Sequence, residues 1–267
     1  LEFDQIIKPD LFKSKKLFNI HFSKLPAYKG MFTSVLPILY GETKSAVTLH
    51  LMERGIDTGE IIAQDEFRIT DEMRSIDLYY LCLRKAIKLF SKYFPKIYNN
   101  KYKHYPQPSI GSSYYSNKTI DYKNLQLDLN KTAFEIKKQI RAFAFRPYQL
   151  LSFNNCLITH AQITNQKSLE RAGKIIDEDE FSFLISTIDY NIVLYKDKLH
   201  MLLDAAEKGN LDTLKKLKSK NYSLTDKNNK GWDALIVAAY YEQFDVCKWL
   251  IKNGADPNSI NYNGTSV

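Results

Sequence analysis

The sequence predicts an α/β module, then a small, mostly β module, then an all-α tail. Three observations carry this prediction. Apolar and alternating runs that are typical of strands precede a long helical stretch in residues 1–105. Short alternating runs separated by turn residues dominate residues 106–198. Residues 199–267 repeat themselves at an offset of 33 positions, which is typical of stacked helical repeats.

The first module is expected to contain three strands and a helix. Residues 17–20 form a short apolar run, as in a buried strand. Alternation predicts further strands over residues 46–52 and 61–69. Ser75 is a suitable N-cap for a helix over residues 75–93, where apolar side chains recur at helical spacing. We expect these elements to form a parallel sheet covered by the helix.

The second module begins after a connection rich in Pro, Gly, Ser and Tyr at residues 104–117. Helical periodicity follows over residues 132–143, and the turn pair Asn154 and Asn155 indicates a hairpin. The strands expected here cover residues 149–158, 174–177, 181–188 and 192–195. Together they predict a small β domain with its own core.

The tail contains an internal repeat. Ala205 and Ala206 are answered by Ala238 and Ala239, 33 positions later, which equals the ankyrin period. Residues 246–258 resemble the second helix and outward loop of an ankyrin repeat. We expect helix pairs over residues 202–218 and 234–253. Because stacked repeats need about three units for stability, we expect more of the array beyond the last residue.

The composition restricts the class of partner and compartment. The formal charge of +8 favours an anionic partner, such as a phosphorylated substrate, polyglutamylated folate, tRNA or acidic lipid. Much of the excess lies in residues 84–103, where a solvated helix face explains it. The three cysteines lack the spacing of a disulfide framework or a zinc site and fit a reducing compartment. No run is apolar over the length of a membrane span.

Three sequence motifs carry the chemistry. The first is Asn-Ile-His-Phe-Ser-Lys-Leu-Pro at residues 19–26, followed by Val-Thr-Leu-His at 47–50 and Gly-Ile-Asp-Thr-Gly-Glu-Ile-Ile at 55–62. In this order they resemble the folate-dependent formyltransferase family. The resemblance implies a Rossmann-like core, here truncated, because the family's first strands and part of its pterin pocket precede the motifs. We therefore expect a fragment with both ends cut, inactive on its own.

The resemblance places the catalytic residues at Asn19, His21 and Asp57. Formyl transfer from N10-formyltetrahydrofolate to an amine requires removal of an amine proton and stabilisation of a tetrahedral oxyanion, without a metal. His21 would take the proton, Asp57 would orient the imidazole, and the Asn19 amide would donate to the oxyanion. We expect the three side chains to converge at the C-terminal edge of the sheet. The alternatives are that His21 is a hydrogen-bonded polar residue without a catalytic role, and that Asp57 only stabilises its turn.

The same resemblance implies two groups of binding residues. For folate they are Ser23, Lys24, Leu25 and Pro26, with the backbone at Ile56 and Thr58. For the acceptor they are Met31, Phe145, Arg146, Tyr148 and Gln149. An arginine for a diphosphate and an aromatic for a base or hexose are chemically suitable. The alternative for the second group is a linker turn with a packed tyrosine.

The acceptor is expected to be a dTDP-linked 3-amino-3,6-dideoxyhexose, as in O-antigen synthesis. The purine-pathway relatives end soon after the catalytic domain, whereas this chain continues. Residues 31–34 resemble the sugar-nucleotide branch rather than the methionyl-tRNA branch, and ankyrin-fused relatives act on such sugars. A methionyl-tRNA formyltransferase-like enzyme stays an alternative, as does an ankyrin-containing scaffold protein with a degenerate formyltransferase domain.

The remaining expectations concern binding partners and cellular location. We expect a cytoplasmic homodimer that binds neither membrane nor nucleic acid. The ankyrin tail would bind a second nucleotide sugar or a protein. The four other histidines share no metal-ligand spacing and are interpreted as structural or surface residues: His50, His104, His160 and His200.

Overall fold

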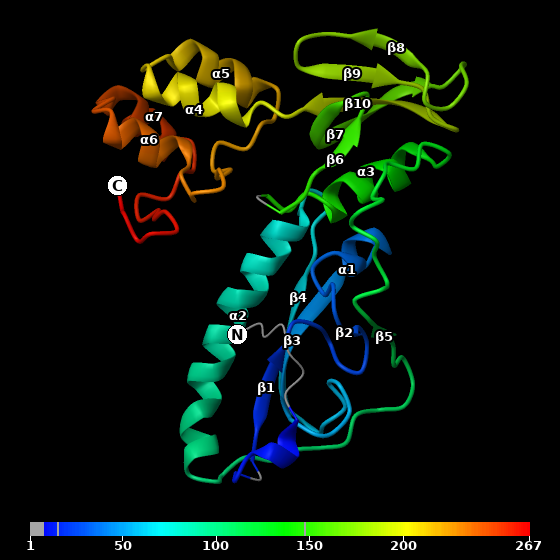
Figure 1. The fold of residues 1–267 in the computed structure, drawn as a ribbon, viewed down its shortest axis with the longest axis vertical. Coiled ribbons are helices and arrows are strands. Elements are labelled where there is room, and N and C mark those ends of the chain that lie inside the picture. The colour runs from blue at the N-terminus through cyan, green and yellow to red at the C-terminus, as the bar shows by residue number, and fades with distance from the viewer. Residues whose placement is uncertain (1–7, 15, 147) are drawn as a thin grey trace. The chain divides into compact units, whose positions relative to one another are not determined.

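The computed structural model describes residues 8–14, 16–146 and 148–267 (Figure 1). The chain divides into two compact units. The first comprises Leu1–Leu125 with Arg141–Phe143, and the second comprises Gln126–Ile140 with Ala144–Val267. Each unit has its own sheet and its own buried apolar side chains.

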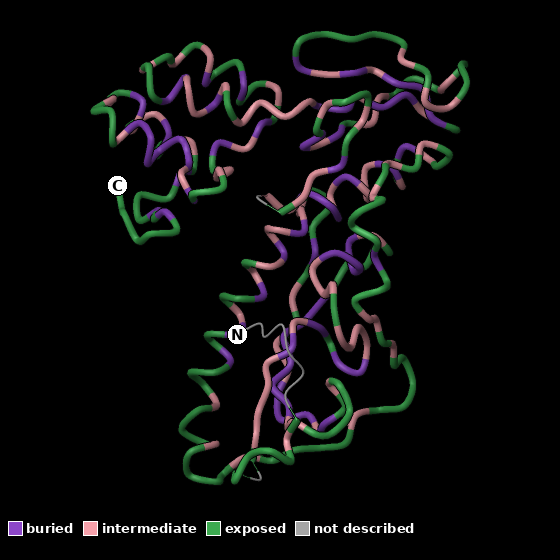
Figure 2. The backbone as a smooth tube through the Cα atoms, in the orientation of Figure 1, coloured by how far each residue is buried: buried purple, intermediate pink, exposed green. Residues whose placement is uncertain are grey.

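The first unit is built on a three-stranded sheet in the order β1-β3-β4. These strands are β1 (Phe18–His21), β3 (Lys44–Leu51) and β4 (Ile61–Arg68). Both pairings are antiparallel, so the expected parallel arrangement is wrong for these strands. The reason is local, because β3 and β4 are joined by a short turn that returns the chain beside itself, whereas parallel strands need a crossover. Six consecutive residues of β3 are buried, which makes it the central strand (Figure 2).

A long helix and several short elements complete this unit. Helix α2 (Ser75–Tyr98) begins as predicted but extends beyond residue 93 through Pro95. Its N-cap is Arg74 rather than Ser75, and the Arg74 N–H donates to Asp77 Oδ2 at 2.9 Å. The short elements are η1 (Pro9–Leu11), α1 (Leu36–Leu39), and the parallel pair β2 (Lys29–Gly30) and β5 (Tyr114–Tyr115).

The second unit contains a five-stranded antiparallel sheet in the order β6-β7-β10-β9-β8. The strands are β6 (Leu151–Phe153), β7 (Cys156–Lys167), β8 (Ile175–Glu178), β9 (Ser182–Ile185) and β10 (Tyr190–Lys196). Helix α3 (Ala133–Ala142) precedes them. The predicted turn at Asn154 and Asn155 is present, with φ of 46° and 61°, as a tight hairpin requires.

The ankyrin helices of the tail are present as predicted. They are α4 (Leu199–Glu207), α5 (Leu211–Ser219), α6 (Ala234–Tyr240) and α7 (Phe244–Lys252). Side chains cap two of them, since Asn210 accepts from the Thr213 N–H and Asp233 from the Ile236 N–H. The tail shares an apolar core with the sheet, to which Phe181 and Tyr195 contribute from the sheet side. Among the described residues, no helix has the length and apolarity needed to cross a membrane.

Candidate active site

Asn19, His21 and Asp57 come together at one end of the first sheet. The Asp57 carboxylate lies at the centre, with Oδ2 3.4 Å from His21 Nδ1. The Asn19 amide donates to Asp57 Oδ1 at 3.3 Å. His21 and Asp57 are nearly buried, with side chains 8% and 10% exposed. The structure thus brings together all three residues that the motifs pointed to.

The local fold explains this convergence. Asn19 and His21 are two positions apart on β1, so their side chains leave the strand on the same side. Asp57 lies in the turn between β3 and β4 and has a left-handed backbone with φ of 52°. Gly59 packs so tightly that a Cβ atom there would lie 1.8 Å from the Leu51 carbonyl oxygen. The Gly30 N–H donates to Asp57 Oδ2 at 2.9 Å and fixes the carboxylate.

The His21 ring faces an acceptor at each nitrogen. Nε2 lies 2.7 Å from the Tyr28 carbonyl oxygen, so it must carry the proton and donate. The separation of 3.4 Å from Nδ1 to Asp57 is longer than that of a charge-assisted hydrogen bond, which fits a neutral ring in this state. Burial lowers the pKa of His21 and outweighs the opposing effects of Asp57 and the Tyr28 carbonyl.

The pKa of Asp57 is lowered as well. Burial acts to raise it, but the contacts with His50, His21 and the Gly30 N–H together outweigh burial. Asp57 is therefore ionised at neutral pH. A neutral imidazole beside a fixed carboxylate is the arrangement that accepts a proton and then stabilises the resulting cation.

His50 belongs to the same cluster, although the sequence indicated only a structural role. Its Nε2 lies 3.6 Å from Asp57 Oδ1 and 3.4 Å from Asn19 Nδ2. Its Nδ1 donates to the Leu51 carbonyl at 2.7 Å, and its Nε2 faces both Asn19 and Asp57. The register that pairs Asn19 with His50 across β1 and β3 creates this contact. The alternation of apolar and polar residues predicted strand β3, but it did not predict which residues of β1 pair with which residues of β3.

The predicted folate residues fall into two groups. Ser23 is buried and donates to the Ala27 carbonyl at 2.7 Å, and Leu25 is only 2% exposed and precedes a cis bond to Pro26. Both side chains are packed within the loop, and their role in folate binding stays a prediction. Lys24 is exposed and pairs with Glu66 at 2.8 Å.

The turn that carries Asp57 remains open to a ligand. Ile56 is 36% exposed, and Thr58 is exposed on the other side of Asp57. The apolar side chain of Ile56 suits one face of a flat heteroaromatic ring such as a pterin. The exposed Ile56 and Thr58 beside Asp57 therefore fit a folate co-substrate.

The predicted acceptor residues belong to both units. Met31 is 46% exposed and follows Gly30, whose N–H binds Asp57. The other four belong to the second unit, where Phe145 and Gln149 form a two-way backbone bridge and Tyr148 is 81% exposed. Arg146 Nη2 donates to Asp197 Oδ1 at 2.7 Å, so its guanidinium already has an anionic partner.

In the described part of the chain, no three or more His, Cys, Asp or Glu side chains form a group that could hold a metal ion.

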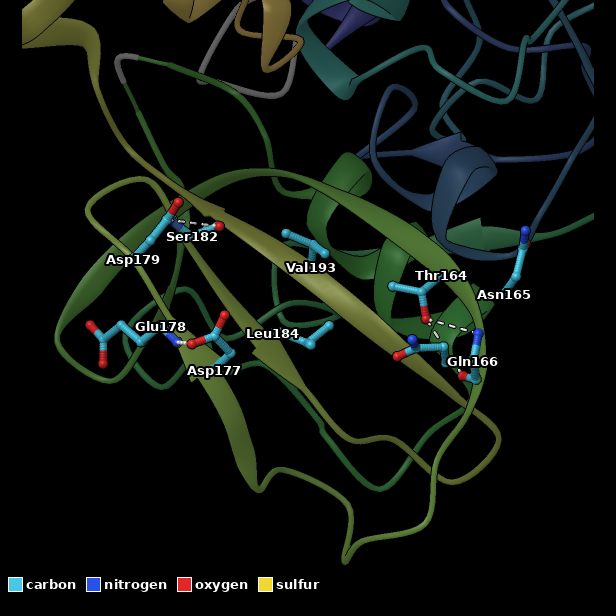
Figure 3. Close-up of a pocket in the computed structure, with 9 residues that line it drawn as sticks. All are labelled: Thr164, Asn165, Gln166, Asp177, Glu178, Asp179, Ser182, Leu184 and Val193. Carbon is cyan, nitrogen blue, oxygen red and sulfur yellow. Dashed lines mark hydrogen bonds between the residues drawn. The ribbon is translucent and has the colours of Figure 1, made fainter.

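A pocket of about 480 Å³ lies on the second sheet, with Leu184 and Val193 between an acidic edge and an amide edge (Figure 3). Its acidic edge is formed by Asp177, Glu178 and Asp179. None of the predicted site residues lines it.

Three family models match successive and partly overlapping parts of the chain. Residues 2–92 match the formyl transferase family, and residues 119–200 match the formyl transferase C-terminal domain. Residues 176–261 match ankyrin repeats.

Two solved structures are similar over most of the chain. The N-formyltransferase from Helicobacter canadensis, in complex with folinic acid and dTDP-3-aminofucose, is 45% identical. The match covers 74% of this chain and 72% of that one, with a TM-score of 0.66. WlaRD, a sugar 3N-formyl transferase crystallised with dTDP and 5-N-formyl-THF, is 46% identical over the same shares, also with a TM-score of 0.66.

Curated relatives with a different acceptor are more distant. The methionyl-tRNA formyltransferase of Clostridium beijerinckii is 30% identical over 66% of this chain. The chain spans 57% of the length of that relative.

Proposed function

This chain belongs to the N-formyltransferase family, and from that premise we propose that the whole protein transfers a formyl group from N10-formyltetrahydrofolate to the amine of a dTDP-linked 3-amino-3,6-dideoxyhexose. The observation that carries the proposal is the cluster of Asn19, His21 and Asp57, in which a buried imidazole lies 3.4 Å from a buried carboxylate. The cluster supplies a base, its orienting anion and an amide donor within one site.

Each residue has a defined task in the transfer. When bound, the folate supplies an activated formyl carbon. His21 receives the proton that the amine loses as its nitrogen bonds to the formyl carbon, and returns a proton to the leaving N10 nitrogen as the bond between that carbon and N10 breaks. The Asn19 amide exchanges one of its present contacts, with Asp57 or His50, for a hydrogen bond to the oxyanion that forms on the formyl oxygen. Asp57 stabilises the imidazolium and selects the tautomer in which Nδ1 carries a proton.

The Tyr28 carbonyl must move before this chemistry begins. It occupies His21 Nε2 at 2.7 Å, which is the nitrogen that an amine would need. When the carbonyl withdraws, the ring can donate from Nδ1 to Asp57 and leave Nε2 as the acceptor. Tyr28 and Phe32 have positive φ, with values of 58° and 65°, which is an unfavourable backbone conformation for residues with side chains. Catalytic contacts often tighten only in the substrate complex.

The choice of acceptor rests on relative similarity. Identity is 45% to 46% with the two sugar enzymes and 30% with the tRNA enzyme, and the former match covers more of both chains. Met31, which follows Gly30, remains the proposed acceptor contact that belongs to the first unit. Arg146 would bind a diphosphate only by exchanging or sharing its Asp197 partner.

The setting of the reaction is part of the proposal. We place the enzyme in the cytoplasm, which the three free thiols support, and its product in surface-polysaccharide synthesis, such as O-antigen. We also propose that the enzyme is a homodimer and that its ankyrin tail binds a protein or a second nucleotide sugar.

The test is incubation of the whole protein with N10-formyltetrahydrofolate and a panel of acceptors, followed by mass spectrometry. The panel contains dTDP-linked 3-amino and 4-amino hexoses, their UDP counterparts and methionyl-tRNA. We expect formylation of the dTDP-linked 3-amino sugar to be fastest. Preferential formylation of methionyl-tRNA would establish the alternative function instead.

A further inference from the structure

Gln107 lies beside the turn that carries Asp57, although the motifs gave no reason to single it out. The segment after α2 runs antiparallel to the start of β4, with Tyr105 and Ile61 exchanging backbone hydrogen bonds of 3.0 and 2.8 Å. In that register, residue 107 falls opposite residue 59. The backbone pairing thus delivers the Gln107 side chain to the turn.

The Gln107 amide joins two carbonyls of this turn. Its Nε2 donates to the carbonyl oxygens of Asp57 and Gly59, each at 2.8 Å. Both amide hydrogens are used, and the orientation is fixed, because a rotated amide would place its oxygen against two other oxygens. Asp57 has a left-handed backbone, which is unfavourable for a residue with a side chain, so the turn needs such support.

The other end of the Gln107 amide makes no hydrogen bond that would explain why the residue is polar. Gln107 Oε1 is buried and has no hydrogen-bond partner among the described residues. A buried acceptor without a partner is unfavourable, and an apolar side chain of the same size would avoid it. A residue that only filled space would therefore be better replaced by leucine.

We propose that Gln107 is a positioning residue for formyl transfer, which holds the backbone at Asp57 so that the carboxylate meets His21 and Asn19. It touches none of the reacting atoms and acts only through Asp57. The kinetic test of this inference rests on the proposed function, whereas the test by His21 titration does not.

The test compares Gln107→Leu and Gln107→Glu with a matched control, Arg141→Met. Arg141 also donates to two turn carbonyls of the first unit, those of Thr70 at 2.6 Å and Met73 at 3.0 Å, but at a different turn. Gln107→Glu keeps the shape and replaces the donor with oxygen. Three quantities are measured in the whole protein: the thermal midpoint, kcat and KM for transfer, and the NMR titration midpoint of His21.

All three variants should lower the thermal midpoint. Only the two Gln107 variants should lower kcat, by about tenfold to a hundredfold with little change in KM, since small misplacement of a catalytic group has effects of this order. Gln107→Leu should also move the His21 titration midpoint toward that of Asp57→Asn, whereas the added negative charge of Gln107→Glu opposes this shift. If the Gln107 variants lose only stability and keep the wild-type kcat and His21 titration, Gln107 is structural and the proposal is overturned. The titration needs no substrate, so it decides the inference even if the whole protein transfers no formyl group.

Discussion

The Asp57 carboxylate and the His21 imidazole lie 3.4 Å apart, although Asp57 belongs to a turn and His21 ends a strand 36 positions earlier. Two backbone features make this possible: the left-handed conformation of Asp57 and the close packing of Gly59 against Leu51. The pairing is buried, so water does not screen it. Catalysis in this account depends on keeping that geometry.

Asp57→Asn should lower kcat by about a hundredfold to ten-thousandfold. A neutral amide cannot stabilise the imidazolium, and it can hold the ring in the wrong tautomer. The Gly30 N–H can still donate to the amide oxygen, so the fold should persist. Steady-state kinetics measure the effect, and a loss smaller than tenfold would refute the orienting role.

Asn19→Ala should lower the rate by about a hundredfold, as expected for an oxyanion donor worth on the order of 3 kcal/mol. The substitution also removes the donor to His50 Nε2. His50→Gln, which alters the same contact without touching the oxyanion donor, is the comparison. If His50→Gln is as slow as Asn19→Ala, the asparagine acts through the cluster rather than on the oxyanion.

The pH profile of kcat/KM should show an acid limb with a midpoint below about 6.5, the ordinary value for histidine. Burial lowers the pKa of His21, so the neutral, proton-accepting ring persists to lower pH. The negative charge of Asp57 raises this pKa, and Asp57→Asn should therefore shift the limb further toward acid. A wild-type midpoint above 7 would show that the imidazolium, not the imidazole, dominates in the free enzyme.

Tyr222→Phe should destabilise the second unit by about 1 to 3 kcal/mol. The Tyr222 hydroxyl is bonded to the carbonyls of Phe181 at 3.1 Å and Lys196 at 2.8 Å, which links the ankyrin tail to the sheet. Tyr240→Phe is the control, because Tyr240 is 67% exposed. Denaturant unfolding compares the two, and equal midpoints would mean that the hydroxyl does not hold the tail to the sheet.

Much of the fold follows from local pattern. The 33-residue repeat and the helical periodicity gave the ankyrin helices, and Asn154 with Asn155 gave the hairpin turn. The prediction of a parallel sheet was wrong. An alternation of strands with a helix does not determine the direction of the strands, and here a short connection between β3 and β4 makes their pairing antiparallel. The module boundaries at residues 106 and 199 stay predictions.

The candidate site was predictable only in part. The motifs point to Asn19, His21 and Asp57, but the contacts of His50 and Gln107 depend on strand register, which one sequence does not encode locally. Arg146 illustrates the same limit, since its partner Asp197 lies 51 positions away. The catalytic and binding roles assigned to individual residues stay predictions.

The most direct test of the central claim is single-turnover formyl transfer by His21→Asn, with binding of the dTDP-amino sugar measured on the same preparation. His200→Asn is the matched control, because His200 is an exposed residue of α4. The account predicts that His21→Asn loses at least about a hundredfold in rate while its affinity for the nucleotide sugar stays near that of the wild type. Retention of more than about a tenth of the wild-type rate would contradict it, because positioning alone would then account for the catalysis.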